Sequence, residues 1–188
     1  MSDTPQTEAP SILDHIPGDL MIWVLIVSEL AIFGAGLLAF LAVRIGDPEG
    51  FAASQDQLHR VSAGINTIVL VTSGFFAALA LGAAEAGRRA RTRLYLGAAA
   101  VLGIVFMILK GVEYGDAIAK GLGTEAHPFF TFYWLLTGFH VAHVAAGVII
   151  LGIVAIRTRP DHVEAGAQFW HMVDLVWVIL FPVIYLLR

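Results

Sequence analysis

The chain of 188 residues contains no cysteine. This absence excludes disulfide bonds, a thiolate nucleophile and any cysteine-ligated metal cluster. Charged residues are scarce, because Asp, Glu, Lys and Arg make up only 14% of the sequence, whereas they approach a quarter of an ordinary soluble domain. Hydrophobic residues make up 58%. The composition therefore indicates an integral membrane protein.

Basic residues are also few, with 11 Lys and Arg against 15 Asp and Glu, and no basic run is interleaved with aromatic residues. This pattern excludes nucleic acid as a partner. Residues 1–19 contain no Lys or Arg. They lack the basic region of a cleavable signal peptide, so we expect them to be retained. Residues 1–16 are predicted to be a solvated tail.

Five apolar stretches are long enough to cross the ~30 Å hydrocarbon core of a bilayer as helices. We place them at about residues 20–43, 63–84, 94–119, 129–156 and 168–187. Asp19 can cap the first helix, and Pro128 suits the first turn of the fourth. Small polar residues in the second span, such as Asn66 and Ser73, are typical of tight helix contacts. The sequence predicts an all-α integral membrane domain of five transmembrane helices over residues 17–188.

The connector between the second and third spans holds the densest basic cluster, formed by Arg88, Arg89, Arg91 and Arg93. Five spans place the termini on opposite sides of the membrane. Basic residues number six on the side of the N-terminus and five on the other, so the dense connector decides the orientation. Because basic loops stay in the cytoplasm, we predict a cytoplasmic N-terminus and an external C-terminus.

Ionisable side chains inside the spans are the candidate functional residues, because charge is costly in hydrocarbon. His140 and His143 lie three residues apart, which places both imidazoles on one helix face. Glu29 lies about nine residues, or ~13 Å, into the first span, where we expect a protonated carboxyl that bonds to an imidazole or a carbonyl. Lys110 and Glu113 could pair near the boundary of the third span, either exposed or enclosed.

A metal site is one interpretation of these residues. His140, His143 and Glu29, with the His171-x-x-Asp174 pair, could ligate zinc or a di-iron centre. However, the Glu-x-x-His spacing of di-iron bundles is not repeated, and two histidines on one face cannot be opposite axial ligands of a haem. We favour hydrogen bonding between helices, so we expect no catalytic residue and no metal ligand in this chain.

The aromatic residues of the fifth span have two interpretations. Trp170, Trp177 and Tyr185 are typical of anchors at the membrane interface. Alternatively, Trp170 and His171, beside Asp174, could grip a lipid head group.

The order and spacing of several short motifs resemble subunit III of haem-copper oxidases, over roughly residues 15–188. The motifs are Pro17-Gly18-Asp19, Ser28-Glu29, Asn66-Thr67, Ser73-Gly74, Lys110-x-x-Glu113-Tyr114, Thr137-Gly138-Phe139-His140-x-x-His143 and Trp170-His171-x-Val173-Asp174-x-x-Trp177. Larger members have seven helices, and this chain resembles the last five, as in quinol oxidase subunit III and the NorE-type subunit linked to nitric oxide reductase. The length and the opening Pro-Gly-Asp favour the NorE-type.

The resemblance implies a bacterial inner-membrane protein that binds no cofactor except phospholipid and packs on a haem-containing catalytic subunit. By resemblance, Glu29, His140 and His143 are buried, proton-linked positions, and Glu164, Trp170, His171 and Asp174 are lipid-binding positions. The expected function is that of a NorE-type accessory subunit that stabilises its catalytic partner. The alternative is subunit III of an aerobic cytochrome c or quinol oxidase, which supports electron transport and proton uptake. A stand-alone membrane metalloenzyme is a remote third interpretation.

Overall fold

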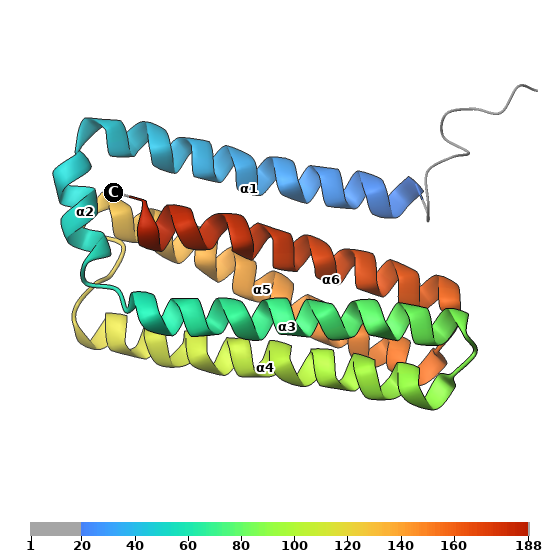
Figure 1. Cartoon of the computed structure of the whole chain (residues 1–188). Coiled ribbons are helices and arrows are strands. Elements are labelled where there is room, and N and C mark those ends of the chain that lie inside the picture. Colours follow the sequence, from blue (N-terminus) through green and yellow to red (C-terminus); the bar gives the residue numbers. More distant parts are fainter. Residues whose placement is uncertain (1–19, 188) are drawn as a thin grey trace, which may run out of the picture.

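The computed structural model describes residues 20–187, so Asp19 and the expected tail over residues 1–16 lie outside the described residues. The described chain forms α1 (Leu20–Gly46), α2 (Pro48–Gln55), α3 (Arg60–Glu85), α4 (Arg89–Ala119), α5 (Pro128–Arg157) and α6 (Pro160–Phe181), and a π-helical turn (Pro182–Leu186) extends α6. Five of these helices are long and apolar enough to cross a membrane. They lie side by side in one bundle (Figure 1), which confirms the predicted fold class.

Two segments that the sequence analysis left outside the spans are helical. The segment after α1 contains α2, whose first turn is stabilised by Pro48 and by the side chain of Asp47, which accepts a hydrogen bond from the Gly50 amide at 3.0 Å. α6 begins at Pro160 instead of residue 168. The apolar pattern missed its first two turns because they carry polar residues, although Pro160 fits a helix start as well as Pro128 does.

α6 is the central helix of the bundle. It packs against α1, α3 and α5, and it separates α1 from α3 (Figure 1). α3 and α4 form a closely packed hairpin, and α4 also packs against α5. Asn66 and Ser73 join the two helices of the hairpin, because their side chains donate hydrogen bonds to the carbonyls of Phe106 and Ala99 at 3.3 and 2.7 Å. These two residues make the helix contacts that the sequence predicted.

Trp170 of α6 lies against residues of α3, α4 and α5. A Cβ atom at Gly147 would lie 2.5 Å from the indole, and one at Gly103 would lie 2.6 Å from it. The indole nitrogen donates a hydrogen bond to the Ser73 hydroxyl at 3.0 Å. Only glycine therefore leaves room for this ring between α4 and α5.

The interfacial assignment of three aromatic residues in α6 needs correction. Trp170, Trp177 and Tyr185 are fully buried in the bundle. Trp177 donates to the Thr67 hydroxyl at 2.9 Å, so its polar group finds a protein partner instead of the head-group layer. An amphipathic ring suits both the membrane interface and the interior of the bundle. Small residues on neighbouring helices, as around Trp170, make room for it in the interior.

One end of the bundle, here called the arginine-rich end, combines the start of α1 with the α3–α4 and α5–α6 turns (Figure 1). It carries Arg88, Arg89, Arg91, Arg93, Arg157 and Arg159. The Arg93 guanidinium donates to the carbonyls of Ala155 and Ile156 at 3.1 and 3.2 Å, which satisfies two of the free carbonyls at the end of α5.

The opposite end is joined by a contact between the start of α5 and the connection after α1. Nδ1 of His127 accepts from the Phe129 amide at 3.1 Å, so its Nε2 carries the proton and donates to Asp47 at 3.0 Å. This hydrogen bond lowers the pKa of Asp47.

Candidate functional site

An ion pair is enclosed near the end of the bundle that is opposite the arginine-rich end. The ammonium of Lys110 lies 3.1 Å from Oε1 of Glu113, one helical turn further along α4. The Lys110 side chain has no exposed surface, and only 5% of the Glu113 side chain is exposed. Of the two arrangements that the sequence left open for this pair, the structure contains the enclosed one.

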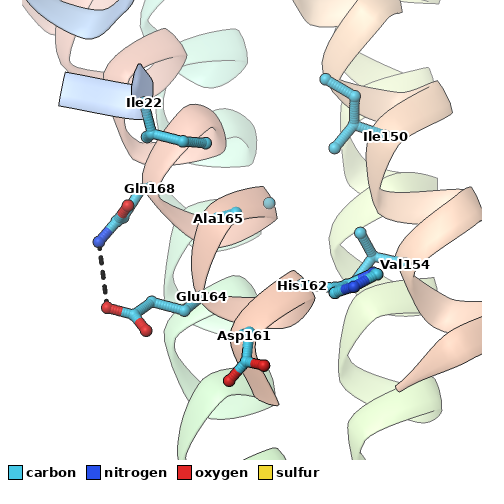
Figure 2. A pocket seen from close by; sticks show the side chains of 9 residues that line it. Ile22, Ile150, Val154, Asp161, His162, Glu164, Ala165 and Gln168 are labelled. Carbon is cyan, nitrogen blue, oxygen red and sulfur yellow. Dashed lines mark hydrogen bonds between the residues drawn. The ribbon is translucent and has the colours of Figure 1, made fainter. Parts of the chain in front are cut away.

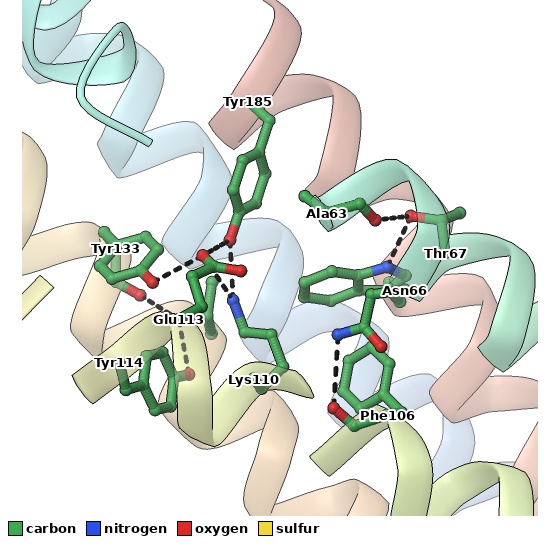
Figure 3. Close-up of polar contacts among 11 residues, drawn as sticks. Ala63, Asn66, Thr67, Phe106, Lys110, Glu113, Tyr114, Tyr133 and Tyr185 are labelled. Carbon is green, nitrogen blue, oxygen red and sulfur yellow. Dashed lines mark hydrogen bonds and ion pairs between the residues drawn. The ribbon is translucent and has the colours of Figure 1, made fainter. Parts of the chain in front are cut away.

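Tyrosine hydroxyls complete the surroundings of the pair (Figure 3). Oε1 of Glu113 accepts hydrogen bonds from Tyr133 at 2.8 Å and Tyr185 at 2.6 Å, while Lys110 donates to the Tyr185 oxygen at 2.7 Å. The ammonium also lies 4.9 to 5.4 Å from the centres of four aromatic rings, those of Tyr114, Tyr133, Trp177 and Tyr185. Cation–π attraction and hydrogen bonds thus replace the water that the charges have lost.

The sequence analysis identified the pair but missed Tyr133 and Tyr185. Tyrosine in a spanning helix is equally typical of the membrane interface. The one signal available was a Lys-x-x-Glu spacing inside an apolar stretch, where two charges require buried partners.

Glu29 and His143 meet between α1 and α5. Oε2 of Glu29 lies 3.1 Å from Nε2 of His143, although the two atoms are not aligned as a hydrogen bond. Nδ1 of His143 lies 2.9 Å from the carbonyl oxygen of Phe139, which can only accept, so Nδ1 carries a proton. Nε2 therefore faces either a protonated carboxyl as an acceptor or a carboxylate as a donor.

His140 lies elsewhere, although it shares a helix face with His143. Its imidazole is fully buried and stacks on Trp177, with ring centres 5.1 Å apart, and the edge of Phe106 lies against it. Neither ring nitrogen has a hydrogen-bond partner among the described residues. The structure thus brings Glu29 to His143 and not to His140.

The four predicted lipid-binding residues separate into three environments. Trp170 is fully buried between helices. His171 and Asp174 lie at a groove between α3 and α6, with Nδ1 and Oδ2 3.5 Å apart. Glu164 accepts a hydrogen bond from Gln168 at 3.3 Å beside a cavity of about 530 Å³ (Figure 2).

The metal interpretation requires at least three ligating side chains in one place. Within residues 20–187, no three side chains of His, Asp or Glu lie close enough together to hold a metal ion. His171 and Asp174 lie at the α3–α6 groove, whereas Glu29 and His143 lie between α1 and α5. Four of the five proposed ligands therefore form two separate pairs, and His140 belongs to neither.

Comparison with known proteins assigns a family to this arrangement. The sequence model described as "Cytochrome c oxidase subunit III" matches residues 19–188. A cytochrome c oxidase subunit 3 of Synechocystis sp. is 33% identical, covering 86% of this chain and 72% of the relative. A probable cytochrome c oxidase subunit 3 of Mycobacterium tuberculosis is 31% identical, with coverages of 86% and 83%. A cytochrome bo(3) ubiquinol oxidase subunit 3 of Pseudomonas aeruginosa is 27% identical, with coverages of 88% and 82%.

Proposed function

The chain belongs to the cytochrome c oxidase subunit III family, and from this premise we propose that it is the non-catalytic subunit III of an aerobic cytochrome c or quinol oxidase. The observation that carries the proposal is the family match across all five helices. The relatives described above are named as subunits of cytochrome c and quinol oxidases. Their names support the alternative from the sequence analysis over the NorE-type assignment and its link to denitrification.

We propose that the chain supports chemistry in a haem-containing catalytic subunit without binding haem or metal itself. The Lys110–Glu113 pair in the interior of the described chain is enclosed by tyrosines, with at most 5% of either side chain exposed. Such an enclosed pair suits a rigid support better than an active site.

The cavity beside Glu164 is the proposed lipid site. It lies at the arginine-rich end, between the start of α1, the end of α5 and the start of α6. Ile22, Ile150 and Val154 provide apolar contacts for acyl chains, whereas Asp161 and Glu164 provide carboxylates (Figure 2). Carboxylates at the depth of the head groups suit a phospholipid with an ammonium group.

The first test removes this chain from the oxidase. A catalytic subunit produced without it is expected to retain its haem spectrum but to lose activity several-fold faster during turnover, because a stabilising partner is missing. The measurement is the half-life of oxygen consumption in membranes, with the wild-type chain restored as the control. An unchanged half-life would contradict the proposed role.

The substrate that the intact complex reduces distinguishes an aerobic oxidase subunit III from a NorE-type subunit. We expect the purified complex to consume oxygen with reduced cytochrome c or a quinol as the electron donor. Nitric oxide reduction in place of oxygen consumption would instead support the NorE-type assignment.

Membrane orientation gives a further prediction. We propose that the arginine-rich end faces the cytoplasm, with the N-terminus inside and the C-terminus outside. A reporter fused to the C-terminus should therefore be active only outside the cytoplasm. Replacing Arg88, Arg89, Arg91 and Arg93 together should weaken this orientation more than replacing Arg44 and Lys110 does. A C-terminal reporter that is active in the cytoplasm would reverse the assignment.

A further inference from the structure

A groove of about 430 Å³ runs between α3 and α6 on the outer surface of the bundle. We call it the α3–α6 groove. Its apolar walls are formed by Val71, Phe75, Ala78, Leu175 and Val178. The large apolar side chains among them are each more than 40% exposed. α1 packs on the side of α6 that faces away from α3 (Figure 1). The exposure of the groove residues shows that no part of the described chain covers the groove.

A carboxyl group lies in this apolar groove. Asp174 is 9% exposed, and its Oδ1 atom is buried without a hydrogen-bond partner among residues 20–187. Its other oxygen lies 3.5 Å from the imidazole of His171, whose side chain is 46% exposed. A Cβ atom at position 74 would collide with the carboxyl group, so Gly74 makes its position possible.

The depth of this pair in the membrane decides what can satisfy it. Asp174 lies roughly 14 residues from the start of α6 and 12 from the end of its extension, or ~21 and ~18 Å. In a hydrocarbon core about 30 Å thick, this position is near the midplane, ~15 Å from either layer of head groups. Acyl chains offer no hydrogen-bond donor there. A polar pair that faces hydrocarbon is costly, and such groups normally face protein.

We propose that the α3–α6 groove is the docking surface for a transmembrane helix of the catalytic subunit, and that this helix presents an N–H or O–H donor to the partly exposed pair of Asp174 and His171. The inference rests on the proposed function and identifies the surface through which it acts. The occupant is an apolar helix, because the walls of the groove are apolar. The small side chain of Ala78 allows the backbone of the docking helix to approach α3 closely.

Photocrosslinking in the whole complex tests the occupant directly. Phe75, which is 60% exposed in the groove, is replaced by a photoreactive phenylalanine derivative, and Leu135 on α5, which is 63% exposed, is replaced in the same way as a control. We expect the Phe75 position to capture the catalytic subunit several-fold more efficiently than the Leu135 position. Capture of lipid alone, or of a second copy of this chain, at Phe75 would overturn the proposal.

Substitutions test the role of the carboxyl group. Asp174→Leu should weaken association with the catalytic subunit about 3- to 20-fold, the range expected for one hydrogen bond between helices in a membrane. Asp174→Asn keeps an acceptor oxygen and should weaken association less. The measurement is the fraction of the chain that stays with the complex during detergent titration. Unfolding of the chain is followed in parallel, and equal retention of Asp174→Leu and wild type would contradict the proposed donor.

A matched pair of bulky substitutions separates the groove from the rest of the surface. Ala78→Trp fills the groove, whereas Ala142→Trp adds the same bulk to an exposed position on α5. Only Ala78→Trp should release the chain. If both variants remain bound equally well, the groove assignment fails while the proposed function stands. If the wild-type chain itself does not co-purify with a haem-containing subunit, the proposed function fails.

Discussion

Glu113→Leu is expected to reduce the free energy of unfolding by about 3–5 kcal/mol, because it leaves the buried Lys110 ammonium without its counter-charge. The ammonium has no exposed surface through which water could replace the lost carboxylate. Tyr133 and Tyr185 also lose the acceptor of their hydroxyl groups. The measurement is unfolding of the purified chain in mixed micelles of mild detergent and increasing dodecyl sulfate.

A double-mutant cycle identifies the ion pair as the cause. Lys110→Met together with Glu113→Leu should recover most of the lost stability, because no unpaired charge remains and apolar side chains fill the site. Lys110→Met alone should cost less than Glu113→Leu, since Glu113 keeps two tyrosine donors. Additive effects of the two substitutions would contradict this account.

A second ion pair, at the end of α4, serves as the matched control. Lys120, the residue after α4, and Asp116 are 2.7 Å apart, and Asp116 also lies 2.9 Å from Nε2 of His59, but all three side chains are at least 40% exposed. Asp116→Leu should therefore change the stability by less than about 1 kcal/mol, as expected for a surface pair.

Glu29→Lys is expected to prevent stable insertion or docking of the chain, whereas Glu29→Gln should preserve assembly. A lysine in the middle of a spanning helix costs about 3 kcal/mol on insertion scales, and here it would face His143. Glutamine keeps the size of the side chain and its ability to form hydrogen bonds. Glu29→Ala should fall between them. Membrane-integrated protein and co-purified catalytic subunit are the quantities to measure.

Infrared difference spectra determine which group holds the proton between Glu29 and His143. We expect a protonated carboxyl band at neutral pH that disappears in Glu29→Gln. Nδ1 of His143 already donates to the Phe139 carbonyl. In a neutral imidazole, Nε2 is therefore free to accept a hydrogen bond from the protonated Glu29 carboxyl. A carboxylate signal accompanied by a charged His143 would instead indicate a buried ion pair.

The sequence predicted the fold well, because long apolar stretches in a membrane have few alternatives to helices. It also identified Glu29, His143, Lys110 and Glu113 as intramembrane groups that need partners. It anticipated the pairing of Lys110 with Glu113 but not the tyrosines around them, since Tyr185 reaches Glu113 from 72 positions away along the chain. Such contacts depend on helix rotation and packing, which the position of one residue in its own span does not reveal.

Trp170 shows the same limit from the opposite direction. Its place in the sequence suggested a lipid contact, and its surroundings in the structure are instead Gly103, Gly147 and Ser73. Two glycines on other helices, which have no side chains, leave room for the indole ring. Sequence patterns record the side chains that are present in one helix, but they do not record which gaps on other helices face them.

Arg93 joins two helices that are synthesised at different times. α4 leaves the ribosome before α5, so the exposed Arg93 guanidinium contacts water or head groups until the carbonyls of Ala155 and Ile156 reach the same side of the membrane. A chain whose fourth span enters in reverse lacks these two hydrogen bonds. The contact between the start of α4 and the end of α5 therefore forms only when α5 has the orientation relative to α4 that the structure shows.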